Sequence, residues 1–146
     1  MLKIRRFLPA DLERVMKIER DSFLNREPWS RNYFEGLYQK CPEGFLVAEN
    51  GGGVRGYTIG QTKNKSAEII SLAVAPAWRK KEIGTKLANF LINSFKEKNI
   101  KEIFLHVRTK NKKVISFYQN LDFEILKTIK NYYRNDEDVY LMLKEI

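Results

Sequence analysis

The sequence has little cysteine, histidine or proline and no long apolar run. It has one cysteine, Cys41, and one histidine, His106, in 146 residues, which excludes an intramolecular disulfide and a cysteine or histidine metal cluster. No segment approaches the about 18 to 20 consecutive apolar residues that a membrane-spanning helix needs. Charges interrupt the apolar residues at the start of the chain, unlike in a signal peptide. We therefore expect a soluble, cytoplasmic protein that binds no metal and no membrane.

Repeats, low-complexity tracts and linkers rich in proline or serine are also absent, so we expect residues 1–146 to form a single domain. Hydrophobic residues make up 43% and aromatic residues 12%, which is enough to build a core. The 27 Lys and Arg exceed the 18 Asp and Glu and give a net charge of +9. Such an excess suits an anionic partner (nucleic acid, a ribosome, an acidic peptide or a phosphate-bearing cofactor), or it forms a solvated basic surface.

The order of apolar patterns and turn signals predicts an α/β fold. Alternating or continuous apolar runs predict strands, and apolar residues three or four apart predict helices. The resulting order, β-α-α-β-β-β-α-β-α-β-β, predicts about four helices around a mixed, seven-stranded sheet. The predicted strands span residues 2–7, 45–48, 54–61, 67–74, 102–107, 124–129 and 138–144. Helices are predicted after Pro9, after the N-cap Ser30, over 83–98, and from the N-cap Asn111 to Leu121.

Two of these segments have a recognisable place in the fold. The strand at 67–74 is largely apolar, which is typical of the centre of a sheet. The helix at 83–98 has its apolar residues three or four apart, which predicts one buried face. The residues of that face are Leu87, Phe90, Leu91 and Phe95.

The passage from the central strand to the third helix has the properties of an anion site. The first turn of a helix exposes unpaired backbone N–H groups and the positive end of the helix dipole. Arg79, Lys80 and Lys81 add positive charge at this point, Gly84 permits close approach of the backbone, and Thr85 can donate a further hydrogen bond. The segment therefore predicts a phosphate or pyrophosphate site. An ordinary basic turn before an ordinary helix has the same composition.

Two motifs on these elements resemble a known superfamily. Arg79-x-x-Glu82-x-Gly84, which follows Leu72-Ala73-Val74, resembles the Q/R-x-x-G-x-G/A signature of the GNAT superfamily of N-acetyltransferases. The stretch from Asn111 through Val114, Phe117 and Tyr118 to Asp122-Phe123 resembles the second pattern of that superfamily, N-x-x-A-x-x-x-Y-x-x-x-G-F. Both motifs stand in the expected order, and the element order resembles the GNAT fold over nearly the whole chain.

Within this superfamily the chain is most similar to protein N-terminal acetyltransferases, both the bacterial RimI type and archaeal and eukaryotic relatives. The supporting stretches are 83–87, 105–108 and 130–133. The resemblance implies acetyl-CoA as cosubstrate and a protein or peptide N-terminus as acceptor, ribosomal or nascent chains included. It implies that Phe23, Tyr132 and Tyr133 contact the acceptor. It implies that the cofactor is bound by Leu72, Ala73, Val74, Arg79, Lys80, Lys81, Glu82, Ile83, Gly84, Thr85, Asn111 and Tyr118.

The chain departs from the family pattern at two glycines. Glu82 replaces the first glycine of the first motif, and its carboxylate should repel a pyrophosphate although it suits the helix dipole. We therefore expect weakened binding of acetyl-CoA. Asp122 replaces the glycine after the fourth helix, where a left-handed backbone is usual. Aspartate tolerates that conformation at a cost of about 1 kcal/mol.

Acetyl transfer to an amine requires a base and a proton donor for the leaving thiolate. An α-amino group has a pKa of about 7.7–8.0, so a modest base such as His106 is sufficient. The alternation of the strand at 102–107 places His106 opposite its apolar neighbours. The resemblance makes Tyr118 the proton donor and Glu68 a catalytic or water-holding group. Each of these three residues also has a purely structural interpretation. His106 can be a hydrogen-bonded structural histidine, Tyr118 a core residue, and Glu68 an ordinary carboxylate at the end of a strand. Asn111 can cap its helix, contact the cofactor, or do both.

Three further expectations concern the reaction and its alternatives. Cys41 lies outside these elements, so direct transfer in a ternary complex is expected rather than an acetyl-cysteine intermediate. The first alternative keeps the fold but has a small amine as acceptor, such as a polyamine or an antibiotic. The second is a degenerate domain that acts as a basic nucleic-acid or ribosome binding module, although dispersed Lys and Arg disfavour nucleic acid as a partner.

Overall fold

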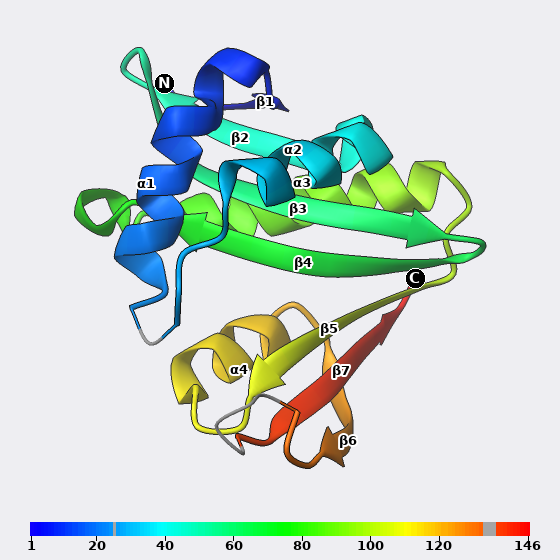
Figure 1. Ribbon diagram of the computed structural model, residues 1–146. Helices are drawn as coiled ribbons and strands as arrows, with labels where there is room; N and C mark the ends of the chain where they lie inside the picture. The colour runs from blue at the N-terminus through cyan, green and yellow to red at the C-terminus, as the bar shows by residue number, and fades with distance from the viewer. Residues whose placement is uncertain (25, 133–136) are drawn as a thin grey trace.

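The strands follow the apolar patterns of the sequence, and seven of them pair into one mixed sheet. The computed structural model describes residues 1–24, 26–132 and 137–146. The strands are β1 (Lys3–Arg6), β2 (Phe45–Asn50), β3 (Gly53–Lys63), β4 (Ser66–Val74), β5 (Glu102–Arg108), β6 (Glu124–Ile129) and β7 (Val139–Glu145). Their order in the sheet is β1-β2-β3-β4-β5-β7-β6, with β4 at the centre. Among the strands of the described residues, only β4 and β5 are parallel neighbours. The predicted α/β order is confirmed (Figure 1).

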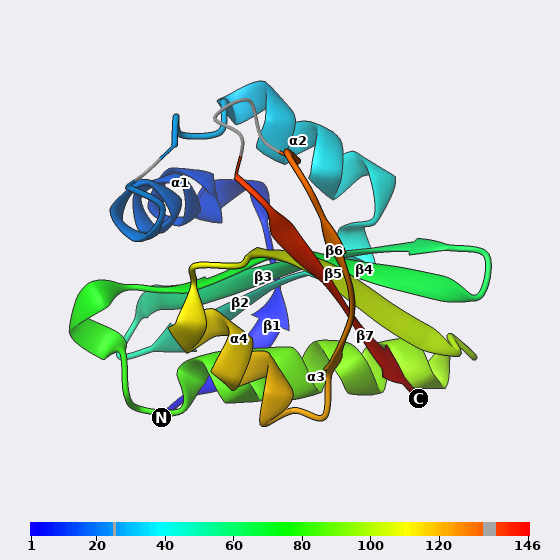
Figure 2. The ribbon, with the colours of Figure 1, turned by 90° about the horizontal axis from the view of Figure 1, so that it is seen from below.

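Four α-helices cover the two faces of this sheet. They are α1 (Leu12–Ser22), α2 (Arg31–Lys40), α3 (Ile83–Glu97) and α4 (Lys112–Gln119). Figure 2 shows α1 and α2 on one side of the sheet and α3 and α4 on the other. Among the described residues, no helix is long and apolar enough to cross a membrane.

Local cap residues explain where the helices begin and end. The Ser30 hydroxyl accepts the Tyr33 N–H at 3.1 Å, and the Asn111 side chain accepts the Val114 N–H at 3.4 Å, so both predicted N-caps are confirmed. Helix α4 ends at Gln119, two residues before the predicted end. The Asp122 N–H bonds to the Gln119 carbonyl in a Schellman-type closure, which stops the helix early.

Each face of the sheet has its own core. Leu87, Leu91 and Phe95 of α3 are buried against one face, whereas Phe34 and Phe45 belong to a second cluster under α1 and α2. The predicted burial of Phe90 is wrong, because its side chain is 45% exposed. The buried side of α3 is centred on Leu91 and continues toward Ala88 and Ile92, which leaves Phe90 at the margin.

A β-bulge in β4 changes which residues face each core. Ile59 of β3 pairs with Ser71 and Gly60 pairs with Ile69, so Ile70 is an extra residue in the ladder. Before the bulge, Ala67 and Ile69 pack on the α3 side; after it, Ala73 packs on the α1 side. The bulge therefore places both Glu68 and Ser71 on the face that α1 and α2 cover.

Strands β4 and β5 separate soon after they begin. Within these two fully described strands, the pairs run only from Ser66–Glu102 to Glu68–Phe104. Beyond them β5 pairs with β7 alone, and Figure 1 shows the ribbons of β4 and β5 diverging from their paired ends. The divergence opens the middle of the sheet beside α3 and α4.

Candidate active site

A cavity of about 880 Å³ lies where β4 and β5 diverge. Leu72 to Val74 of β4, the first turn of α3 and the inner side of α4 line it, together with Ser22 and Phe23 at the end of α1. A cavity of this size can hold most of a cofactor or a drug-sized ligand. Every element that lines it comes from a different part of the chain, so the sheet topology positions the site.

The first turn of α3 points its backbone donors at this cavity. The first i→i−4 hydrogen bond of the helix runs from the Lys86 N–H to the Glu82 carbonyl at 3.1 Å. The N–H groups of residues 83–85 therefore have no acceptor within the helix, and the Glu82 side chain does not cap them. Together with the positive end of the helix dipole, these donors form an anion-binding site.

The turn before α3 uses a backbone conformation that was not predicted. Lys80 and Glu82 both have left-handed backbones, with φ of 64° and 63°. A side chain at such a position costs about 1–2 kcal/mol relative to glycine, which explains why the family pattern has glycine where this chain has Glu82. Asp122 also has a left-handed backbone, with φ of 68°, as the sequence predicted.

The charges around the cavity are mainly positive. Its basic lining residues are Arg79, Lys80, Arg108, Lys110 and Lys113, and its acidic ones are Glu82 and Glu137. Two of the cations have partners: Arg79 donates to the Val74 carbonyl at 3.0 Å and to the Ser22 hydroxyl at 3.1 Å, and Arg108 pairs with Glu137 at 2.5 Å. Backbone N–H donors with surrounding cations suit the diphosphate and phosphate groups of acetyl-CoA.

The cavity includes all but one of the residues predicted to bind the cofactor. Lys81 is the exception, since it is exposed and does not line the cavity. Sequence reasoning missed Trp78, Lys110, Lys113 and Phe117, which also line it. The two lysines flank Asn111 in sequence, so the signal that could have found them was their place beside a predicted helix N-cap.

Tyr118 lines the cavity and carries a buried hydroxyl group. Its side chain is buried between Phe117 and Phe123, whose ring centroids lie 5.0 and 5.4 Å away. The Phe123 N–H bonds to the Tyr118 carbonyl at 3.0 Å, which fixes the residue at the end of α4. Burial raises the pKa of the Tyr118 hydroxyl above its ordinary value. The group therefore stays protonated near neutral pH and can donate a proton.

Glu68 and His106 meet at the point where β4 and β5 separate. Glu68 pairs with Phe104 across the ladder, and His106 follows two residues later on the same face of β5. The Glu68 Oε2 atom lies 3.4 Å from the His106 Nδ1 atom. The Tyr132 ring stacks on the imidazole, with centroids 5.1 Å apart and planes at 20°. Both catalytic candidates from the strands are thus adjacent, and the Tyr132 ring covers one of them, His106.

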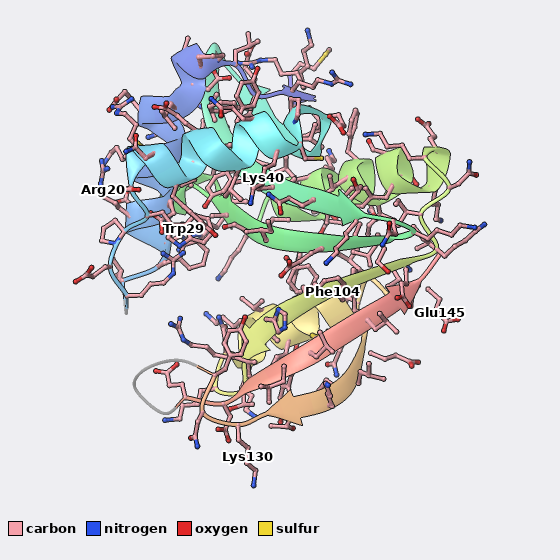
Figure 3. The ribbon with its side chains drawn as sticks, turned by 45° about the vertical axis from the view of Figure 1, so that its right-hand side comes forward. Arg20, Trp29, Lys40, Phe104, Lys130 and Glu145 are labelled. Atoms are coloured by element: carbon pink, nitrogen blue, oxygen red, sulfur yellow. The ribbon has the colours of Figure 1, made fainter. Side chains whose placement is uncertain are left out.

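The group formed by Glu68, His106 and Tyr132 does not line the cavity itself. Neither Glu68, His106 nor Tyr132 belongs to the cavity lining, whereas Tyr118 and Phe23 do. Figure 3 shows Phe104 on β5 and Trp29 on the α1–α2 side of the sheet. Tyr133, predicted to contact the acceptor, lies outside the described residues. The described residues contain no group of three or more His, Cys, Asp or Glu side chains that could hold a metal ion.

Comparison with known proteins assigns the chain to a family. Residues 12–123 match the profile of the Acetyltransferase (GNAT) family. The chain belongs to this family. The resemblance found in the two sequence motifs is therefore confirmed, and the seven-stranded sheet with its divergent β4 and β5 is a GNAT fold.

Similarity to individual GNAT proteins extends over nearly the whole chain. An uncharacterized N-acetyltransferase of Methanocaldococcus jannaschii is 36% identical, over 97% of this chain and 90% of that protein. An N-alpha-acetyltransferase of Sulfurisphaera tokodaii is 30% identical, over 96% of this chain and 90% of that protein. Among solved structures, Ard1 from Thermoplasma volcanium has a TM-score of 0.93 at 29% identity, covering 99% of this chain and 97% of that one. The structure of Naa20 from Chaetomium thermophilum in complex with a bisubstrate analogue has a TM-score of 0.87 at 30% identity. The match covers 99% of this chain and 86% of that one.

Proposed function

We propose that residues 1–146 act as a single-domain, cytoplasmic N-terminal acetyltransferase. The enzyme transfers the acetyl group of acetyl-CoA directly to the α-amino group of a protein or peptide, with ribosomal and nascent chains among its candidate acceptors. The observation that carries this proposal is the cavity at the first turn of α3, whose lining includes Arg108, two residues along β5 from His106 of the Glu68–His106 pair. The names of the relatives, N-alpha-acetyltransferase and Naa20, support the choice of acceptor.

The cavity residues divide the binding of acetyl-CoA between them. The N–H groups of residues 83–85 hold the diphosphate, and Lys80, Lys110 and Lys113 balance its charge. Asn111 caps α4 at the rim, and Leu72 to Val74 offer the backbone of β4 beyond its last pair with β5. Bound acetyl-CoA supplies an activated acyl group as a thioester. Glu82 opposes this binding with a negative charge at the same rim.

His106 acts as the base toward the acceptor amine. The α-amino pKa of about 7.7–8.0 lies close to neutral pH, so a modest base is sufficient to take the proton of the acceptor amine. Glu68, 3.4 Å from the imidazole, stabilises the positive charge that the ring gains when it takes the proton. Tyr132, Phe23 and Tyr133 contact the first residues of the acceptor.

Tyr118 acts as the acid toward the leaving thiolate. Its buried hydroxyl group remains protonated near neutral pH, and the residue lines the cavity that would receive the thioester. Cys41 is buried at the end of α2 and does not line the cavity, which favours direct transfer over an acetyl-cysteine intermediate. Transfer therefore needs both substrates bound at once.

A peptide panel tests the proposal. We expect acetyl-CoA-dependent acetylation of peptides with a free N-terminus, and none of the same peptides blocked at the N-terminus but carrying lysine. The His106→Ala and Tyr118→Phe variants should lower kcat by about 10²–10⁴-fold. Turnover of polyamines alone would replace the peptide by a small amine as acceptor. RNA binding without any stabilisation by acetyl-CoA would reject an enzyme altogether.

A further inference from the structure

Glu19 is a buried carboxylate that the proposed chemistry does not use. It lies in the third turn of α1, and its side chain is 1% exposed. Two donors satisfy it: the Arg26 Nη1 atom at 2.6 Å and the Trp29 backbone N–H at 3.2 Å. Both donors belong to the segment 26–30 between α1 and α2, so one carboxylate ties this segment back to the helix.

Arg26 extends the same attachment through two aromatic rings. Its guanidinium carbon lies 4.5 Å from the ring centroid of Phe23 and 4.6 Å from that of Trp29. Trp29 in turn packs edge-on against Tyr33 and Phe34 of α2. Because a buried carboxylate without its cation is strongly unfavourable, the pair holds these rings in one arrangement.

The fixed segment borders both halves of the active site. Phe23, which contacts Arg26, lines the cavity. Trp29 packs against the same core cluster as Ile70, the bulged residue of β4 two positions after Glu68. Figure 3 shows Trp29 in the segment between α1 and α2, and Phe104 on β5, two residues before His106.

We propose that the Glu19–Arg26 pair is a positioning device for the acceptor peptide: it fixes Phe23 and Trp29 as one wall of the acceptor site. The inference rests on the proposed function. Neither Glu19 nor Arg26 touches the reacting atoms, so both act through the rings that they hold. Loss of the pair should weaken binding of the peptide more than binding of acetyl-CoA, because Phe23 is only one of the residues that line the cofactor cavity.

The test compares Glu19→Gln with a matched control. Glu19→Gln keeps an acceptor for the Trp29 N–H but removes the charge that Arg26 needs. Asp11→Asn is the control, because Asp11 also accepts from an arginine, Arg5, at 2.8 Å and from a backbone N–H at 2.8 Å, and it does not line the cavity. Both variants lose a part-buried ion pair, so both should lower the midpoint of thermal unfolding.

The Michaelis constants separate the two variants. We expect Glu19→Gln to raise the KM for peptide about tenfold and to change the KM for acetyl-CoA less than about twofold. Arg26→Met should do the same, Arg26→Lys should recover part of the loss, and the double variant should be no worse than either single one. Hydrogen exchange of the Trp29 amide should accelerate in Glu19→Gln, because segment 26–30 opens more often without the Arg26 ion pair even though an acceptor remains, and it should stay unchanged in Asp11→Asn.

The outcomes distinguish this inference from the proposed function. A wild-type protein that acetylates no peptide would overturn the proposed function, and the acceptor role of the pair with it. If the wild type acetylates peptides but Glu19→Gln shifts the peptide KM no more than Asp11→Asn does, the positioning role alone is wrong. Equal increases in both Michaelis constants, or an unchanged Trp29 amide, would overturn it as well.

Discussion

Replacing Glu82 by glycine should tighten acetyl-CoA binding, although it deletes a charged side chain from a helix N-terminus. Glu82 has a φ of 63° and no capping hydrogen bond, so its side chain contributes strain and no bond. Removing a left-handed side chain recovers about 1 kcal/mol, and the greater freedom of glycine in the unfolded chain takes back roughly 0.5–1 kcal/mol. The free energy of unfolding should therefore stay within about 1 kcal/mol of wild type.

The charge has the larger effect on the cofactor. Glu82 is exposed at the rim of a cavity whose donors suit a diphosphate. Repulsion between surface charges at such a rim is worth about 0.5–1 kcal/mol, which corresponds to a two- to fivefold change in binding. We expect Glu82→Gly to lower the KM for acetyl-CoA by this factor. Glu82→Gln should give most of the same gain, since it removes the charge and keeps the backbone strain.

Two other left-handed residues provide matched controls. Lys80→Gly relieves the same kind of strain at a φ of 64° but removes a positive charge that lines the cavity, so the KM for acetyl-CoA should rise. Asp122→Gly relieves strain at a φ of 68° away from the cavity and should leave that KM unchanged. Steady-state kinetics at low and high salt give the KM for acetyl-CoA of the three glycine variants. The opposite changes in KM of Glu82→Gly and Lys80→Gly should shrink at about 1 M salt, where the Debye length is about 3 Å.

The direction in which Lys80→Gly changes the KM for acetyl-CoA distinguishes an electrostatic effect from an effect of backbone strain. If Glu82→Gly and Lys80→Gly both lower the KM, backbone strain governs cofactor binding and the electrostatic account is wrong. If Glu82→Gly raises it, the carboxylate assists binding, and the first turn of α3 does not hold an anion in the way argued above.

Two further predictions concern the reacting groups. Glu68→Gln and His106→Ala should each lower kcat, and the double variant should be no slower than His106→Ala alone; effects that multiply would mean that the two side chains act independently. Burial raises the pKa of Tyr118 above its ordinary value of about 10. The contribution of the protonated hydroxyl group to the free energy of unfolding is therefore complete below about pH 10, and it is lost as the pH rises further, because the unfolded chain ionises first. The midpoint of thermal unfolding should therefore fall more steeply above about pH 10 for the wild type than for Tyr118→Phe. Equal falls in the two proteins would contradict this.

Local patterns predicted the elements well because they depend on neighbouring residues. In β5 the alternation of Ile103, Leu105 and Val107 with polar positions predicted that His106 faces the other side, and these three residues are buried while His106 is partly exposed. The caps Ser30 and Asn111 were equally readable, since a cap bonds to an amide three residues later.

The arrangement of the site depends on pairing between distant strands, and sequence patterns do not carry it. The bulge at Ile70 exists because β3 and β4 slip by one residue, and a continuous apolar strand shows no alternation that would reveal the slip. The left-handed Glu82 was missed because glutamate rarely adopts that backbone. Glu19 had a local signal that was overlooked: it shares the apolar stripe of α1 with Leu12 and Val15, where a carboxylate needs a buried partner.

The short junction between β4 and β5 has a mechanical consequence. Three residue pairs join the parallel strands, so the sheet consists of two hydrogen-bonded ribbons, β1 to β4 and β5 to β6, connected at one narrow neck. A small rotation about that neck changes the width of the opening without stretching any other ladder. Between the two ribbons the core under α3 and α4 therefore takes over the role that hydrogen bonds have elsewhere in the sheet, since it contains Ile69 of β4 together with Leu105 of β5.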